Sequence, residues 1–91
     1  EMAATPHEYT EYDWFGQARI RETNDDFEGA IEAYDEAIKL NPKFAKAHYY
    51  KALAHYQLGQ MDEAKTAAEK ALELKPGWKE HVTDNMPKLE I

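Results

Sequence analysis

The stretch AHYQLGQMDEAKTAAEKALELKP, residues 54–76, decides the fold of this chain. Its alanine spacing and its Leu-x-Pro ending recur 34 residues earlier, and a fixed period of this kind points to a repeat architecture. An aromatic residue follows each ending, Phe44 in one copy and Trp78 in the other. The identical pairs at this offset are Ala18 with Ala52, Ala30 with Ala64, Ala33 with Ala67, Ala37 with Ala71, Leu40 with Leu74, and Pro42 with Pro76.

Capping residues and helix breakers divide the chain into five expected helices. The first opens at Thr5, with Pro6 and Glu8 behind it, or alternatively at Thr10, and runs to about residue 23. Asp25 or Asp26 caps a second helix that ends near residue 40. The breaks at 41–43, 59–60 and 75–77 then predict helices at 44–58, 61–74 and 78–86. Because no strand-like alternation is present, the predicted fold class is all-α.

The repeat resembles the tetratricopeptide repeat family, whose unit is a helix–turn–helix of about 34 residues with a Trp, Leu-Gly, Tyr, Ala, Phe and Pro pattern. The matching residues are Trp14, Ala18, Ala52, Ala30, Ala64, Tyr34, Ala37, Ala71, Pro42 and Pro76. The departures are His48 for the tryptophan, Arg21 and His55 for the tyrosine, and Ala68 for the second-helix aromatic.

This resemblance implies an α-solenoid of two helix–turn–helix units followed by a C-terminal capping helix. We expect a single domain over 1–91, with an N-terminal extension at 1–10, repeats at 11–44 and 45–78, and a capping helix and tail at 79–91. Each unit buries its apolar face only on a neighbour, so two units need a cap, an extended first helix or self-association. Polar residues in the last helix favour the cap.

Composition narrows the function classes. The net charge of −7 and the absence of cysteine argue against a nucleic-acid binder, a disulfide scaffold and thiolate metal sites. No apolar run reaches the roughly 20 residues that span a bilayer, so we expect no membrane partner and, without a targeting signal, a cytoplasmic protein. The chain contains no serine and no glycine-rich phosphate loop, and its carboxylates fall at turns and exposed faces. We therefore expect no enzyme activity and no cofactor.

The family resemblance implies that the first helices of each pair line a concave groove that binds a peptide of a partner protein. Residues spaced by three, four and seven along those helices should project into this groove. Alternatively, some of the rings pack between helices, and we expect this least for Tyr49 and Tyr56. The candidate groove residues are Tyr12, Phe15, Arg19, Lys46, Tyr49, Tyr50, Leu53 and Tyr56.

Family members that hold the C-terminal carboxylate of heat-shock chaperones use Lys, Asn and Arg side chains on three successive first helices. The matching positions here are Phe15, Arg19, Tyr50, Glu80 and Asp84. Since only Arg19 is a cation, and Glu80 and Asp84 would repel a carboxylate, we expect no carboxylate clamp.

Two further patterns have an ordinary and a functional interpretation. His48 and His55 share a helix face, but their spacing separates the rings by about 10 Å, so packing roles are favoured over a metal site. The acidic residues in 22–36 provide solubility or attract a basic partner.

The leading hypothesis is a peptide-docking module. The alternative is structural self-association, as a homodimer or within a longer repeat array, and the chain begins at Glu1 without a starting methionine, as an excised piece would.

Overall fold

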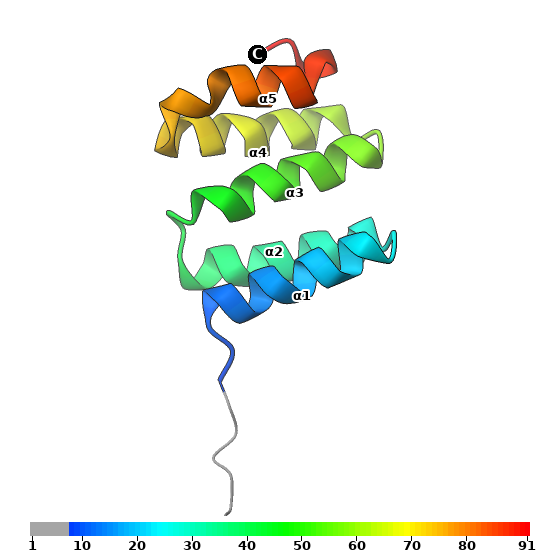
Figure 1. Ribbon diagram of the computed structural model, residues 1–91, viewed down its shortest axis with the longest axis vertical. Helices are drawn as coiled ribbons and strands as arrows, with labels where there is room; N and C mark the ends of the chain where they lie inside the picture. The colour runs from blue at the N-terminus through cyan, green and yellow to red at the C-terminus, as the bar shows by residue number, and fades with distance from the viewer. Residues whose placement is uncertain (1–7) are drawn as a thin grey trace, which may run out of the picture.

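The computed structural model describes residues 8–91, and within them the chain folds into a stack of five α-helices (Figure 1). No strand occurs in this part of the chain. Short 3-10 turns precede and follow the last helix, at Pro76–Trp78 and Pro87–Leu89. The helices are α1 (Glu11–Thr23), α2 (Phe27–Leu40), α3 (Ala45–Gln57), α4 (Met61–Leu74) and α5 (Lys79–Asn85).

The ends of the first two helices follow their capping residues. Thr10 Oγ1 accepts a hydrogen bond from the Asp13 N–H at 3.2 Å, and the Asp13 carboxylate accepts from the Thr10 N–H at 2.9 Å. This reciprocal box confirms Thr10 as the start of α1, whereas the Thr5–His7 signal lies outside the described residues. Asp26, rather than Asp25, caps α2 by accepting from the Gly29 N–H at 2.9 Å.

The turns inside both helix pairs have the same hydrogen bonding. Each contains one residue with left-handed backbone, Asp25 at φ 63° in the first pair and Gly59 at φ 78° in the second. The N–H that follows this residue donates to a carbonyl five positions earlier, which is the Schellman ending of a helix. These bonds join Asp26 to Arg21 at 2.8 Å and Gln60 to His55 at 2.9 Å.

Alanines let the paired helices approach closely. Ala18 and Ala30 in the first pair, and Ala52 and Ala64 in the second, are completely buried. Small side chains at a helix crossing allow two backbones to come together, so the predicted all-α arrangement of two helix pairs and a C-terminal helix is confirmed. The repeat boundaries at 44 and 45 stay a prediction.

The core forms two clusters, one for each helix pair. The first is built around Tyr34, which is completely buried among alanines of α1, α2 and α3. The second receives Val82, Met86 and Leu89 from the C-terminal segment, and these cover the alanines of α4. Since α2 and α4 have only 14 residues each, and the other helices of residues 8–91 are shorter, none has the length and apolarity needed to span a membrane.

Candidate partner-binding surface

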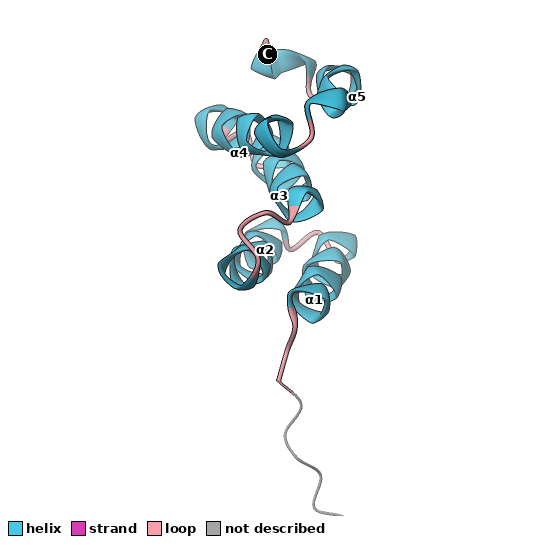
Figure 2. Ribbon diagram, turned by 90° about the vertical axis from the view of Figure 1, so that its left-hand side faces the viewer, coloured by secondary structure: helices cyan, strands magenta, loops and turns pink. Residues whose placement is uncertain are grey.

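Helices α1 and α5 lie on one side of the molecule. Figure 2 shows α2 and α4 on the other side, with α3 between the two sides. We call the first side the α1/α3/α5 face. It is the face that the family resemblance implies is concave, and all eight candidate groove residues belong to α1 or α3.

Tyr50 of α3 contacts two candidate groove residues of α1. The guanidinium carbon of Arg19 lies 4.1 Å from the centre of the Tyr50 ring, and the Phe15 ring lies 5.7 Å from it. A cation over an aromatic face at this distance is attracted to the ring quadrupole. The structure therefore brings together Phe15, Arg19 and Tyr50, which the sequence placed in one groove.

Glu22 partly neutralises the Arg19 cation. An Arg19 nitrogen lies 3.2 Å from one Glu22 oxygen, and the Tyr34 hydroxyl donates to the other. Burial, and then the hydrogen bond to the Glu22 carboxylate, raise the pKa of Tyr34 far above its usual range. Glu22, which accepts from the Tyr34 hydroxyl, thus pairs with the Arg19 cation that lies over the Tyr50 ring.

Tyr12 and Lys46 are exposed members of the set, as is Arg19. The Tyr12 side chain is 68% exposed, and its ring meets the edge of Phe44 with a centroid separation of 5.4 Å. Lys46, which is also exposed, occupies the equivalent position in the second repeat. Both side chains are therefore available to a ligand on the α1/α3/α5 face.

Tyr49 is buried rather than exposed, although it lines a hollow beside α3, and its role in binding stays a prediction. Its side chain is only 5% exposed because α5 and the turn before it fold over α3. The Tyr49 ring packs against Trp78 and His81, with centroid separations of 6.0 and 5.2 Å. Burial also raises the pKa of Tyr49. This residue belongs to the second core cluster.

Leu53 and Tyr56 are half-buried, and they too pack against the second cluster. The Tyr56 hydroxyl accepts a hydrogen bond from the backbone N–H of Lys88 at 3.2 Å, so the C-terminal turn holds this ring in place. The alternative expectation, that some rings pack between helices, therefore describes Tyr49 and Tyr56.

A hollow of about 310 Å³ lies between α3 and the C-terminal segment. Two of its residues, Trp78 and His81, were not predicted. Trp78 could have been found from the repeat, since it is equivalent to Phe44, which packs on Phe15 at 5.2 Å. The repeat gives no such equivalence to identify His81. The lining residues are Lys46, Tyr49, Tyr50, Trp78 and His81.

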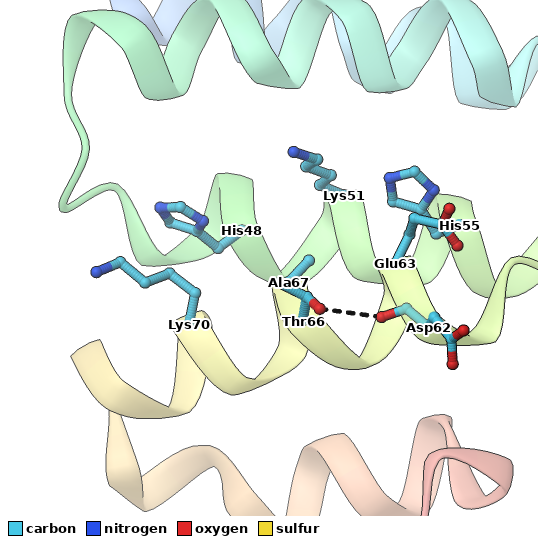
Figure 3. A pocket seen from close by; sticks show the side chains of 8 residues that line it. All are labelled: His48, Lys51, His55, Asp62, Glu63, Thr66, Ala67 and Lys70. Carbon is cyan, nitrogen blue, oxygen red and sulfur yellow. Dashed lines mark hydrogen bonds between the residues drawn. The ribbon is translucent and has the colours of Figure 1, made fainter.

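A second hollow, of about 580 Å³, is lined by residues of α3 and α4. Figure 3 shows His48, Lys51 and His55 of α3 along it, with Thr66 and Lys70 among the α4 residues below. Lys51 crosses toward α2 and forms an ion pair with Asp35 at 2.6 Å. We call this the inter-repeat hollow.

Both histidines in the inter-repeat hollow have structural partners. The buried His48 ring places Nε2 2.9 Å from the Pro42 carbonyl, and His55 Nδ1 lies 2.7 Å from the Gln60 side-chain oxygen. Burial lowers the pKa of His48, and the nearby Lys51 and Lys70 act in the same direction. Within residues 8–91, no three potential metal ligands gather in one place.

Comparisons with known proteins agree with this geometry. The family model described as Tetratricopeptide repeat matches residues 15–77. A protein SGT1 homolog of Oryza sativa subsp. japonica is 42% identical over 66% of this chain and 16% of its own length. Hsp70-Hsp90 organizing protein 1 of Glycine max is 49% identical over 52% of this chain and 8% of its own length. A protein STIP1 homolog of Dictyostelium discoideum is 30% identical over 85% of this chain and 13% of its own length.

The chain spans less than a fifth of the length of each of these curated relatives. The family match and the relatives support a protein–protein interaction module and point to a role without catalysis. The matched segment covers more than two thirds of the chain and includes most of α1 and all of α2, α3 and α4. The chain therefore belongs to the tetratricopeptide repeat family.

Proposed function

We propose that the α1/α3/α5 face binds a peptide segment of a partner protein, with the hollow between α3 and α5 as its anchor point. The observation that carries this proposal is the combination found there, in which aromatic walls from Tyr50 and Trp78 meet an exposed cation, Lys46. Aromatic pockets of this kind hold the side chains that contribute most to the affinity of a protein interface.

The charges on this face favour a ligand with an acidic group beside an apolar side chain. The apolar side chain would enter between Tyr50 and Trp78, while the acidic group would approach Lys46. Arg19 contributes less to such a ligand, because Glu22 already neutralises it. Tyr12, at the far end of the face, extends the contact surface.

Some relatives are named Hsp70-Hsp90 organizing proteins, and this raises the question of a chaperone carboxylate as ligand. At the positions that a carboxylate clamp would use, Glu80 and Asp84 are exposed acids on α5. Their charge would repel a C-terminal carboxylate, so we propose an internal peptide segment as the ligand.

The test is a peptide-display selection on the intact chain, followed by affinity measurements on variants. We expect Lys46→Glu and Tyr12→Ser to weaken the selected peptides, while Lys65→Glu, an equally exposed lysine on α4, leaves the affinity unchanged. Amidation of the peptide C-terminus should have no effect. Equal weakening by Lys65→Glu would move the site off this face, and a strong effect of amidation would restore the carboxylate clamp.

The alternative function, self-association as a homodimer, is tested on the same samples. Light scattering across a range of concentrations should return a constant monomer mass if the chain is a docking module. A mass that rises toward the dimer, and that falls back in Lys46→Glu or Tyr12→Ser, would instead assign this face to a second copy.

A further inference from the structure

The first repeat has a hollow at its outer end, away from the second repeat. It measures about 380 Å³ and is bounded by Trp14 and Arg21 of α1 and by Glu32, Ala33 and Glu36 of α2. An offset of 34 residues places these five positions on residues that line the inter-repeat hollow. The equivalent residues are His48, His55, Thr66, Ala67 and Lys70.

The second repeat shows which element packs against such a face. There α2 of the preceding pair packs against α3 beside the hollow, and the small residues Ala47 and Ala54 of α3 are 0% and 1% exposed. Lys51 of the same helix pairs with Asp35 of the covering helix at 2.6 Å. This face of a helix pair therefore receives a helix, with an ion pair across the contact.

The equivalent positions on α1 carry no such helix within residues 8–91. Ile20, equivalent to Ala54, is 57% exposed. A Cβ added at Gly16, equivalent to Tyr50, would meet no atom of the described residues within 4 Å. Ile20 lies one helical turn from Gly16, and together they form a small apolar surface beside the hollow. We call Gly16, Ile20 and the hollow the end face.

The two hollows differ in charge. Where the second repeat has Thr66 and Lys70, the first has Glu32 and Glu36, and Gln17 replaces Lys51. The lining of the first hollow also includes the cation Arg21, whereas Asp62 and Glu63 balance the two lysines of the inter-repeat hollow. Glu36 is paired with Lys39 at 3.0 Å, but the side chains are 42% and 70% exposed, and a surface pair of this kind is weak. Trp14 adds an aromatic wall, with Tyr9 edge-on to it at 4.9 Å.

We propose that the end face binds an amphipathic helix of a partner protein whose polar edge carries lysine or arginine. Its apolar stripe would lie over Gly16 and Ile20, as α2 lies over α3. Its cations would approach Glu32 and Glu36 beside the Trp14 ring, where carboxylates and an aromatic face both attract a positive charge. A second copy of this chain fits poorly, because each copy has a net charge of −7 and its α2 presents Asp35 at the contact.

The test uses a synthetic peptide with the sequence of residues 27–40 in which all four acidic residues are replaced by lysine. Titrated into the labelled intact chain, it should shift the NMR signals of the Gly16 and Ile20 amides and of the Trp14 indole. The unmodified acidic peptide is the matched control, and it should shift these signals little. Shifts confined to α3 and α5, or equal shifts with both peptides, would overturn the proposal.

Variants test the contribution of the two glutamates directly. The double variant Glu32→Lys/Glu36→Lys should weaken the lysine peptide about fivefold, as expected for the loss of two partly exposed charge pairs. The control Glu69→Lys/Asp84→Lys makes the same change in net charge on α4 and α5, and should have less than about a twofold effect. Equal weakening by both would show attraction to net charge alone. A dimer that Ile20→Asp disrupts would assign the end face to a second copy and overturn the basic partner.

Discussion

The two helix pairs have the same backbone arrangement but fill their cores with different side chains. In the first pair, the Tyr34 ring is completely buried and stacks 6.4 Å from Tyr50 of the next pair. The equivalent position of the second pair is Ala68, and Val82 and Met86 from the C-terminal segment pack against its cluster. A pair that is followed by another repeat thus carries its own large ring, whereas the last pair leaves room for the side chains of the segment that covers it.

The same comparison extends to the turns and to the outer faces. The left-handed turn position is an aspartate in the first pair and a glycine in the second, although the hydrogen bonds are the same. The hollow on the face toward the N-terminus has two glutamates and one arginine in the first pair, and two lysines with two acidic residues in the second. The two pairs therefore share a backbone arrangement but carry different side chains at equivalent positions.

The strongest test of the comparison is Tyr34→Ala, which gives the first pair the residue of the second without the segment that fills the space. Emptying this site should cost about 3–5 kcal/mol of unfolding free energy, as for other buried aromatic residues. The control Tyr34→Phe keeps the ring and loses only the hydroxyl bond to Glu22, so its cost should be nearer 1 kcal/mol. Chemical denaturation measures both, and similar small losses would show that the ring is not a core element.

Tyr49→Ala probes the contact between the second pair and α5. Because the Tyr49 ring packs on Trp78 and His81, its removal should lower the unfolding free energy by about 2–4 kcal/mol. Tyr12→Ala removes an exposed ring of the predicted groove and should change the unfolding free energy little. Thermal unfolding followed by circular dichroism distinguishes them, and an unaffected Tyr49→Ala would place α5 away from α3.

Ala64→Leu and Ala30→Leu place the same extra carbons at the crossing of each pair. Both alanines are completely buried, so each substitution should cost about 1–3 kcal/mol through overpacking. Matched losses would show that the two crossings are equally tight. An unchanged melting temperature for either variant would mean that its alanine does not lie at the crossing.

Exchanging the turn residues should produce a smaller effect with opposite signs. Asp25→Gly relieves a left-handed backbone and should raise the unfolding free energy by about 0.5–1 kcal/mol, whereas Gly59→Ala should lower it by about 1 kcal/mol. Denaturation of the two single variants is the measurement. Destabilisation by Asp25→Gly would indicate that the aspartate side chain contributes more than its backbone strain costs.

The smallest effect concerns pH, and only the second pair should show it. Burial lowers the pKa of His48 in the folded protein, so the unfolded chain binds more protons below the ordinary histidine pKa of about 6.5. Stability is therefore complete above that pH and declines as the pH falls through the folded value. His48→Gln, which retains a donor for the Pro42 carbonyl, should remove this part of the slope between about pH 7 and 5. An unchanged slope would assign it to other groups.

The arrangement of the helices was predictable because their signals are local. The 34-residue period, the crossing alanines and the breaks near residues 24, 41, 59 and 75 indicated two helix pairs and a further helix, as the structure has them. The start at Thr10 was identified as the alternative, through its capping residue. Each of these signals acts within one helix or turn, so it can be read before the chain folds.

The candidate groove was predicted only in part, because burial depends on contacts between distant segments. Phe15, Arg19 and Tyr50 meet as the helical spacing implied. The same spacing placed Tyr49 on the exposed side, but it cannot show that residues 78–91 fold back over α3. The contributions of Trp78 and His81 to the hollow were missed for the same reason.

The sequence by itself therefore determined the helical class, the repeat period, the close helix crossings and the net charge, because these depend on residue type and short-range spacing. The tertiary structure alone decided that Tyr49 is a core residue, that Glu22 pairs with Arg19, and that Ile20 of the first repeat is exposed where its equivalent Ala54 is buried. Whether a side chain on a helix faces solvent or a neighbour is set by the element packed against it, and that element lies elsewhere in the chain.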